Sequence, residues 1–543
     1  MMTRPANPEE REALQPTRSV AAAVGLMVGL VFLPVVAGNF VNWDDDLYVS
    51  RVPFGQALAS GLTRIHASGN WHPLTTLSHA IDHALWGMWP AGHHLTSLVL
   101  HGINASLVVM LAAALFRARV RDPHVRQSGL LLAVMTGLLW GLHPLRVESA
   151  AWISERKDLL CALFYVLGLL AHLRYARTAE RRWYAGALAC CGLALLSKPM
   201  AVSFPFLLVV LDAYPLERLR RAGVGRVLAE KVPFVLLAAL IGGLTLHGQR
   251  LGGAMRALHD VPFTTRTLVA AQSLVGYVGK TLMPAELHAL YLYPRNVTIT
   301  DWRFALPVLL IVVVVTTVVH GFRHHKALAA ALAAYFLLLV PVLGIVQVGP
   351  QASADRYTYL PGIALALLFG ATVDDLWHRT VPTARLWLTL SALAMILGLS
   401  WLSSRQIAVW RNSETLWSRS LAFEPGSIEA HNSRADYYYG QHRFQEALFD
   451  YTAALAGVPA TSPAHAIKRR AAILNDRAVT FVQLHMLERA IADETEAIRL
   501  QEGRMDYYLN RARMLRLAGR IEDAATDERR ARRMADAALG APK

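Results

Sequence analysis

Three adjacent carboxylates, Asp44, Asp45 and Asp46, directly follow an apolar run from about Val20 to Phe40. At a rise of about 1.5 Å per residue, a helix over this run is long enough to cross the hydrocarbon core of a membrane. Ionised groups are costly near lipid and adjacent like charges repel, so cations, a metal ion or a functional need for negative charge must offset this placement. The loop could serve a function that needs negative charge. The simpler alternative is a solvated acidic loop that ends the helix.

Further carboxylates and cations recur beside other apolar runs. Together they suit a lipid-linked substrate that carries a phosphate, because Arg or Lys can hold the phosphate while a carboxylate accepts a proton. The candidate substrate-binding residues are His72, His94, Arg156, Lys198, Lys280, Arg356 and Tyr357, and the candidate supporting carboxylates are Glu148, Asp158 and Asp355.

A metal ion is a separate question. The spacing of His83, His93 and His94 does not match a zinc motif. A divalent cation such as Mg²⁺ or Mn²⁺ stays open, with Asp45 and Glu148 as candidate ligands. Glu148 and Asp158 could equally orient a neighbouring arginine.

Composition identifies a membrane protein. Of 543 residues, 54% are hydrophobic and only 17% are charged, below the charge content of ordinary soluble domains. The net charge of +15 is not gathered into one patch with interleaved aromatic residues, which argues against nucleic acid as a partner. The basic residues lie between apolar runs, where membrane topology accounts for them.

The apolar runs predict an all-α bundle of about eleven spans in residues 1–404. Arginine-rich connections near 117–126, 174–182 and 218–226 should lie in the cytoplasm by the positive-inside rule. The run at 268–283 is more amphipathic, and we expect an interfacial or re-entrant helix there. An odd number of spans then puts the polar tail on the same side as the three carboxylates.

The polar tail, residues 405–543, carries an internal repeat. The pairs Arg434-Ala435, Arg477-Ala478 and Arg511-Ala512 each open a predicted helix, and the last two pairs are 34 residues apart. Thirty-four residues is the period of tetratricopeptide repeats, which stack as helical hairpins into an α-solenoid. Such a stack could hold a peptide or protein, or it could merely brace the membrane domain or a dimer.

A family resemblance rests on motifs in a fixed order along the whole chain. They are FVNWDDDLYV, WHPLTTLSHAID, GHHLTSLVLHGINASL, HPLRVESAAWISERKDLL, LALLSKP and ADRYTYLP, followed by the repeats. This series resembles the transmembrane O-mannosyltransferases with tetratricopeptide repeats and their bacterial relatives, which belong to the GT-C glycosyltransferases. The resemblance implies a catalytic carboxylate at Asp44 or Asp45. It also carries functional positions over to His94, Glu148, Arg156, Asp158, Asp355, Arg356 and Tyr357; His72 departs from the Arg of many animal members.

The resulting hypothesis is an inverting glycosyltransferase. It would move a monosaccharide from a polyprenyl phosphate to an acceptor hydroxyl, on Ser or Thr of a protein docked by the repeats. Lipid surrounds the bundle, and the composition favours a bacterial inner membrane with a periplasmic site, or the lumenal side of the endoplasmic reticulum in a eukaryote. The alternatives are a noncatalytic membrane anchor for a repeat scaffold and a transporter of lipid-linked sugar.

Overall fold

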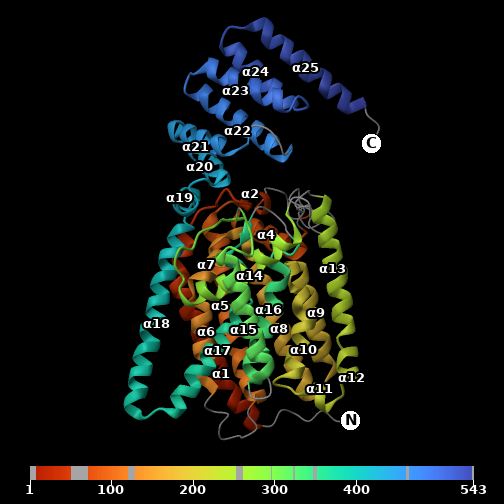
Figure 1. Ribbon diagram of the computed structural model, residues 1–543, viewed down its shortest axis with the longest axis vertical. Coiled ribbons are helices and arrows are strands. Elements are labelled where there is room, and N and C mark those ends of the chain that lie inside the picture. Colours follow the sequence, from red (N-terminus) through yellow and green to blue (C-terminus); the bar gives the residue numbers. More distant parts are fainter. Residues whose placement is uncertain are drawn as a thin grey trace. The chain divides into compact units, whose positions relative to one another are not determined.

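The computed structural model describes residues 8–49, 55, 71–119, 129–251, 261–294, 296–321, 325–346, 351–459 and 464–540. Within these residues the chain is helical apart from one two-stranded sheet, which confirms the predicted all-α fold (Figure 1). The chain divides into two compact units. The first is Met1–Leu287 with Tyr291–Arg411, and the second is His288–Leu290 with Asn412–Lys543.

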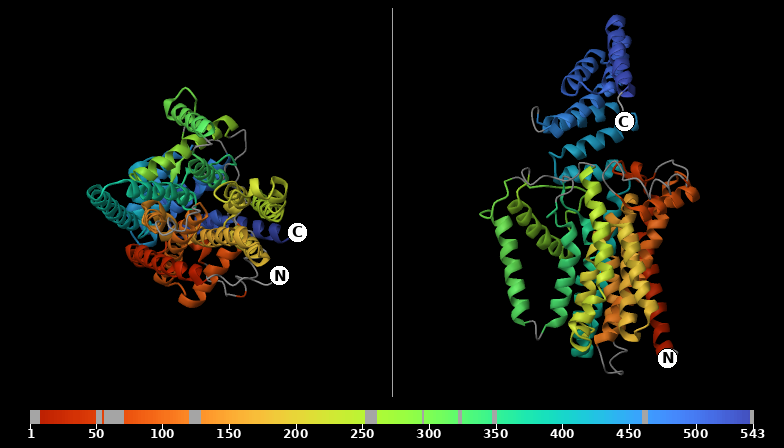
Figure 2. Two further views of the ribbon diagram at one scale, coloured as in Figure 1. Left: turned by 90° about the horizontal axis from the view of Figure 1, so that it is seen from below. Right: turned by 90° about the vertical axis from the view of Figure 1, so that its right-hand side faces the viewer.

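Each of the eleven apolar runs expected to span forms a helix of the first unit. These helices are α1 (Pro8–Phe32), α5 (Pro90–Arg119), α6 (Gly129–Gly141), α8 (Arg156–Thr178), α9 (Arg181–Ser197), α10 (Phe204–Ala213), α13 (Val232–Leu251), α15 (Trp302–Gly321), α16 (Lys326–Leu339), α17 (Gly362–Arg379) and α18 (Pro382–Val409). Helices α13 and α18 lie on opposite sides of the bundle (Figures 1 and 2).

Among the described residues, six helical segments are long and apolar enough to cross a membrane. They are built on α1, α5, α8, α13, α15 and α18. A seventh results if α6 is counted with the segment Pro144–Ala151, from which it is bent by 60°. The remaining helices α9, α10, α16 and α17 are shorter or less apolar, so the count of eleven crossings stays a prediction. Residues 120–128 and 322–324, in two of the basic connections, lie outside the described residues.

Shorter elements link these helices. They are η1 (Leu33–Ala37), α2 (Asp45–Tyr48), α4 (Pro73–Trp86), η3 (Pro144–Arg146), α7 (Val147–Ala151), η4 (Ile153–Glu155), η5 (Pro199–Ser203), α11 (Arg218–Arg221), α12 (Val224–Ala229), α14 (Phe263–Leu282), β1 (Tyr291–Leu292), η6 (Val340–Val342), β2 (Gln351–Ser353) and η7 (Asp355–Thr358), where η denotes a 3₁₀ helix. Strands β1 and β2 pair antiparallel, with Tyr291 opposite Ser353.

Helix α14 differs from the spans, as the sequence predicts. It has 20 residues but is not among the helices apolar enough to cross a membrane. In the right-hand view of Figure 2 it runs obliquely in the upper half of the bundle. Its buried face, which includes Ala270 and Tyr277, packs against Tyr335 and Leu339 of α16 and Ala364 of α17. This placement agrees with an interfacial or re-entrant helix.

The interior of the bundle is built around α5 and α8. In the apolar 18-residue window of each of these spans 56% of the residues are buried, compared with 11% in the windows of α15 and α18, which therefore lie at the periphery. Helix α5 approaches α1 closely at Gly25, where a Cβ would lie 2.5 Å from the carbonyl oxygen of Gly102. Glycine is needed here because any side chain would force the two backbones apart.

The second unit contains α19 (Ser413–Phe423) and three successive helix pairs. The pairs are α20 (Ile428–Gly440) with α21 (Phe444–Gly457), α22 (Ala464–Gln483) with α23 (Leu487–Leu500), and α24 (Met505–Leu517) with α25 (Ile521–Gly540). The repeated alanines of the sequence pattern are buried in the apolar clusters of this unit: Ala435, Ala447, Ala478, Ala490, Ala512 and Ala524. Small side chains at these positions let the helices pack closely.

One ion pair recurs in every helix pair of this unit. Nε of Arg477 donates to Oδ2 of Asp493 at 2.6 Å, and its Nη2 donates to Oδ1 at 2.9 Å. The same two-bond pairing joins Arg434 to Asp450 and Arg511 to Asp527. Each bridge fixes the first helix of a pair on the second, and bidentate geometry makes it stronger than a single ion pair.

We expect the substitution Arg477→Ala to destabilise the second helix pair by about 2 kcal/mol, because Asp493 loses a charged and largely buried partner. Hydrogen exchange followed by mass spectrometry on the full chain should show earlier deuterium uptake in α22 and α23. The matched control is Arg499→Ala, which breaks an exposed pair with Glu496 and should leave the exchange unchanged. Equal exchange in both variants would contradict the structural role of the bridge.

Candidate functional site

The acidic loop between η1 and α2 separates the roles of its aspartates. Asp45 is buried, and its carboxylate accepts hydrogen bonds from the backbone N–H of Val41 at 2.9 Å and of Ser154 at 3.0 Å, and from the Ser154 hydroxyl at 2.5 Å. Burial raises the pKa of Asp45 to about 7, although these three donors lower it. Asp45 thus ties the loop to η4.

Asp44 has a different environment. It is half-buried and caps the start of α2 with a positive φ of 62°. Its backbone carbonyl accepts from the N–H groups of Leu47 and Tyr48, but its carboxylate has no hydrogen bond or ion pair with any described residue. Burial raises the pKa of its carboxyl, while the nearby positive charges of Lys157 and Arg356 lower it. A carboxylate that is partly shielded from water, unengaged and next to cations can accept a proton from a substrate.

Arg356, on η7, is one of the cations that the sequence analysis predicts to hold a phosphate. Its Nη1 donates to Glu148 at 2.5 Å, and its Nε lies 3.3 Å from Oε1 of Glu155. The guanidinium also lies over the rings of Trp43, at 5.6 Å, and Trp152, at 5.3 Å. Its third nitrogen, Nη2, has no partner among the described residues.

Stacked tryptophans bring the acidic loop and Arg356 together. The rings of Trp43 and Trp152 stack at 4.4 Å, and Nε1 of Trp152 donates to the carbonyl oxygen of Trp43 at 2.8 Å. Trp410, at the end of α18, stacks on Trp152 at 5.7 Å. Arg356 therefore lies beside the residue that precedes Asp44, although the two segments are far apart in sequence.

Glu155 links the cations of the site, and the sequence analysis missed it. Its two carboxylate oxygens contact Lys157 at 3.0 Å and Lys198 at 3.1 Å, in addition to Arg356. Lys198 also donates to Asp158 at 2.7 Å, and Asp158 accepts from Ser149. The available signal was the run of four consecutive charged residues, Glu155 to Asp158, in which Glu155 begins the cluster.

Tyr357, on η7, lies next to the cations Arg356 and Lys198. The Tyr357 ring lies 5.1 Å from the Arg356 guanidinium and 5.8 Å from Nζ of Lys198. Its hydroxyl accepts a hydrogen bond from Gln351 at 3.2 Å. The predicted residues Glu148, Asp158, Lys198, Arg356 and Tyr357 therefore form one connected cluster.

Lys280 and Asp355 form a neighbouring pair. Nζ of Lys280 donates to Asp355 at 2.9 Å and lies 3.2 Å from the centre of the Tyr291 ring, whose hydroxyl donates to the other Asp355 oxygen at 2.9 Å. Because Tyr291 is on β1 and Asp355 follows β2, the small sheet positions both partners. Asp355 thus anchors the start of η7 to α14.

Buried contacts hold the rest of η7. The Arg146 guanidinium donates to the carbonyl oxygen of Thr358 at 2.5 Å and to its hydroxyl at 2.7 Å. Glu148 accepts from the backbone N–H of Arg356 at 2.8 Å. The chain bends between α6 and η3, at His143 and Pro144, because proline interrupts the helix. Arg146 and Glu148 follow this bend, and both contact η7.

Arg156 belongs to a separate network. It forms an ion pair with Asp82 of α4, donates to the carbonyl oxygen of His93 at 2.7 Å, and approaches the Ser97 hydroxyl at 3.4 Å. Both Arg156 and Arg356 are buried, but their partners differ: Arg156 pairs with Asp82, and Arg356 pairs with Glu148 and Glu155. The structure therefore does not bring Arg156 together with the cations around Glu155, and its position indicates that it holds α8 against α4 and α5.

The two predicted histidines contact the acidic loop. Nδ1 of His72 lies 3.1 Å from the hydroxyl of Tyr48, at the end of α2. His94, buried on α5, lies beside Gly38, where a Cβ would come within 3.0 Å of its Nε2. Both histidines are thus in positions that support the loop carrying Asp44.

We expect Asp82→Asn to lower the stability of the first unit by about 3–5 kcal/mol, because it leaves the buried Arg156 without its carboxylate. Thermal unfolding in detergent measures this loss. Asp375→Asn, which breaks the exposed pair with Arg379, is the matched control and should not change the midpoint. If Asp82→Asn unfolds like the wild type, the bracing role of Arg156 is wrong.

The candidate metal ligands do not form a metal site. Asp45 is engaged by Val41 and Ser154, and Glu148 is engaged by Arg356. In the described part of the chain, no three His, Cys, Asp or Glu side chains are placed so that they could hold a metal ion. Arg356, Lys157 and Lys198 instead supply the positive charge of this region.

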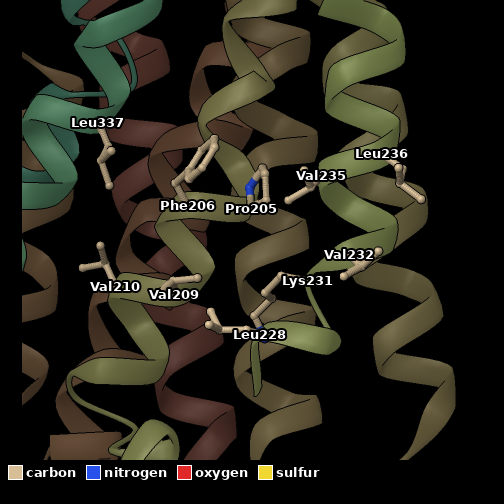
Figure 3. Close-up of a pocket in the computed structure, with 10 residues that line it drawn as sticks. All are labelled: Pro205, Phe206, Val209, Val210, Leu228, Lys231, Val232, Val235, Leu236 and Leu337. Carbon is tan, nitrogen blue, oxygen red and sulfur yellow. The ribbon is translucent and has the colours of Figure 1, made fainter. Parts of the chain in front are cut away.

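An apolar groove lies away from this cluster (Figure 3). It has a volume of about 520 Å³ between α10, the α12–α13 segment and α16, and its lining includes Phe206, Leu236 and Leu337. Lys231, which also lines it, pairs with the buried Asp212 at 2.6 Å and approaches Glu230 at 3.7 Å. The charge of Lys231 is therefore already balanced, and the groove contains none of the predicted site residues.

The fold and the site together define a class: an integral membrane protein of helices with a buried charged site, joined to a unit of helix pairs. No protein-family model matches the chain. The chain is similar to protein O-mannosyl-transferase TMTC1 of Homo sapiens, with 22% identity over 450 residues, 74% of this chain and 49% of the relative.

Shorter matches agree. Protein O-mannosyl-transferase TMTC2 of Mus musculus is 28% identical over 164 residues, 29% of this chain and 18% of the relative. TMTC4 of Homo sapiens is 29% identical over 175 residues, 29% of this chain and 23% of the relative. The chain thus spans less than half the length of these curated relatives. The matches confirm the resemblance that the ordered motifs indicated.

Proposed function

We propose that this chain is an inverting glycosyltransferase that moves a monosaccharide from a polyprenyl phosphate to a hydroxyl group of an acceptor protein. The observation that carries the proposal is a contrast between two carboxylates. That of Asp45 is fully engaged, whereas that of Asp44, near Lys157 and Arg356, has no hydrogen bond or ion pair with a described residue. Asp44 is the general base. The names of the relatives make mannose the first sugar to test and Ser or Thr the first acceptors.

In the proposed reaction, Asp44 accepts the proton of the acceptor hydroxyl while its oxygen attacks the anomeric carbon. The bond between that carbon and the phosphate oxygen breaks, and the electron pair leaves with the lipid phosphate. Attack from the face opposite the phosphate inverts the configuration. The products are the glycosylated acceptor and the polyprenyl phosphate, and no further reactant is needed.

Positive charge stabilises the departing phosphate in this proposal. Nη2 of Arg356 is free to donate to a phosphate oxygen, and Lys157 and Lys198 lie on the same carboxylate, Glu155. The three cations are balanced by Glu148, Glu155 and Asp158, so the site is held together without substrate. Fixed cations in a site of low dielectric stabilise developing negative charge more strongly than in water.

The proposal places the site at the outer leaflet, in the periplasm if the source is bacterial and in the lumen of the endoplasmic reticulum if it is eukaryotic. The positive-inside distribution of arginines supports this side. The repeats, on the same side, would bind the acceptor protein, and membrane lipid would surround the bundle. Cysteine labelling at Asn42 and Asn296 from each side of sealed vesicles tests the orientation, and labelling from the cytoplasmic side would contradict it.

The pH dependence of transfer should follow the pKa of Asp44. Because burial raises this pKa, activity should be lost as the pH falls through a value above the usual carboxyl range. Lys157 lowers the pKa, so Lys157→Gln should shift the acid limb to higher pH; Asp46 raises it, so Asp46→Asn should shift the limb to lower pH. Rate profiles over pH measure both shifts, and shifts of the same sign would exclude Asp44 as the titrating group.

Assays of sugar transfer and of lipid translocation distinguish a glycosyltransferase from a noncatalytic scaffold and from a transporter. Purified full-length chain in liposomes is supplied with polyprenyl-phosphate mannose and a Ser/Thr peptide, and mass spectrometry follows a hexose increment on the peptide. A noncatalytic scaffold would give neither peptide modification nor lipid movement. A transporter would move the lipid between leaflets without modifying the peptide, and either result would overturn the proposal.

A further inference from the structure

The first helices of the three pairs in the second unit carry a row of acids and carboxamides. Asp436 is on α20, Asp476 on α22 and Asp506 on α24. Asn432 donates to Asp436 at 3.1 Å, Asn475 to Asp476 at 2.9 Å, and Asn510 to Asn475 at 2.8 Å. We call this row, Asn432, Asp436, Asn475, Asp476, Asp506 and Asn510, the acidic face.

A buried carboxylate lies against the acidic face. Glu494, on α23, is 0% exposed, and neither of its carboxylate oxygens has a hydrogen-bond partner among the described residues. Burial, together with the negative charges of Asp476 and Asp506, raises its pKa to about 8. Burial and the charge of Asp436 raise the pKa of Asp476 to about 6. Burial and the neighbouring negative charges therefore disfavour ionisation of both carboxyls in the free protein, and a nearby positive charge would favour it.

The cations near the acidic face are engaged elsewhere. Arg477 pairs with Asp493, and Arg511, which faces Glu494, pairs with Asp527. Arg504 pairs with Asp506 at the exposed end of the row. Within the described residues, no Lys, Arg or His forms an ion pair with Asp436, Asp476 or Glu494. Compensating charge must come from a proton or from a ligand.

We propose that the acidic face binds a positively charged, extended polypeptide segment of a partner protein. A Lys or Arg side chain of the segment lies against Asp476, and its positive charge compensates Asp476 and, through space, the buried Glu494. The carboxamides of the acidic face bond to its peptide groups. The acids and amides recur on successive helix pairs, which suits an extended chain. A metal ion is a poorer fit, because no suitable ligand group exists in the described part.

Fluorescence anisotropy on the full chain in lipid nanodiscs tests the proposal. The probes are a labelled synthetic peptide with lysines among serines and threonines, and the same peptide with glutamine at each lysine. The lysine peptide should bind at least about tenfold more tightly, and its affinity should fall as salt rises. Equal binding of the two peptides would overturn the proposal.

Three variants locate the binding. Asp476→Asn and Glu494→Gln should each weaken binding of the lysine peptide about tenfold. Asp536→Asn, which removes an exposed acid of α25, is the control and should bind as the wild type. Glu494→Gln should not lower the unfolding temperature, because the buried carboxyl that it replaces has no hydrogen-bond partner among the described residues. Unchanged binding in both Asp476→Asn and Glu494→Gln would place the peptide elsewhere and overturn the proposal.

Binding of a positively charged segment does not depend on the function proposed above. That the segment belongs to the protein that is glycosylated does rest on that function. Asp44→Asn should abolish transfer and leave peptide binding intact. Loss of binding in Asp476→Asn with transfer retained to a short soluble peptide would keep the acidic face as a docking surface. Failure of the lysine peptide to bind, with transfer retained, would remove the acidic face and leave the glycosyltransferase proposal standing.

Discussion

Replacement of Asp44 by Asn is expected to lower the rate of sugar transfer about a thousandfold, because general-base catalysis contributes on the order of 10²–10⁴ to a rate. Asn has almost the same shape as Asp but cannot accept the proton of the acceptor hydroxyl. The Asp44 carboxylate has no hydrogen bond or ion pair with a described residue, so its replacement by a carboxamide should leave the fold intact. Single-turnover transfer from polyprenyl-phosphate mannose, with thermal unfolding alongside, measures both quantities.

The neighbouring aspartates supply the controls for this variant. Asp46→Asn removes an exposed charge of the same loop and should retain the plateau rate. Asp45→Asn replaces one of the two carboxylate oxygens that accept these three hydrogen bonds by an NH2 group, which cannot accept, and should lower stability together with activity. Full turnover by Asp44→Asn, or an equal loss of rate in Asp46→Asn, would exclude Asp44 as the base.

Arg356→Lys should lower transfer about a hundredfold or more at saturating donor, because electrostatic groups aimed at developing charge often contribute 10²–10³. Lysine keeps the positive charge but cannot contact Glu148 and Glu155 while also presenting a free donor, as the planar guanidinium does. It would also lose the stacking on Trp43 and Trp152. Separate determination of kcat and KM measures where the loss occurs.

A matched substitution distinguishes this effect from a general loss of arginine. Arg303→Lys, in an exposed pair with Asp301, should leave both kinetic constants unchanged. Arg356 also holds η7 through Glu148, so thermal unfolding must accompany the kinetics. If Arg356→Lys unfolds earlier but the folded fraction retains the full rate, Arg356 is only a structural brace and the proposed phosphate contact is wrong.

Features that depend on local pattern could be predicted from the order of the residues. Hydrophobic runs predicted the helices of the bundle, and the amphipathic stretch at 268–283 predicted α14. The 34-residue period predicted the positions of the buried alanines in the second unit. Arg477 and Asp493 could be identified as repeat positions because their spacing recurs at Arg511 and Asp527. Helix formation and repeat spacing are encoded within a few turns of chain, so they can be predicted without the fold.

Which polar side chains contact one another depends on the packing of the helices in three dimensions. Arg156 and Lys157 are adjacent in sequence, yet the first pairs with Asp82 and the second with Glu155, because successive helical side chains point in different directions. The adjacent Asp44 and Asp45 also have different environments. Asp45 binds Ser154, which is 109 residues away in the sequence, whereas the Asp44 carboxylate has no partner among the described residues. Contacts across such separations depend on how the helices pack, and no local pattern in the chain specifies them.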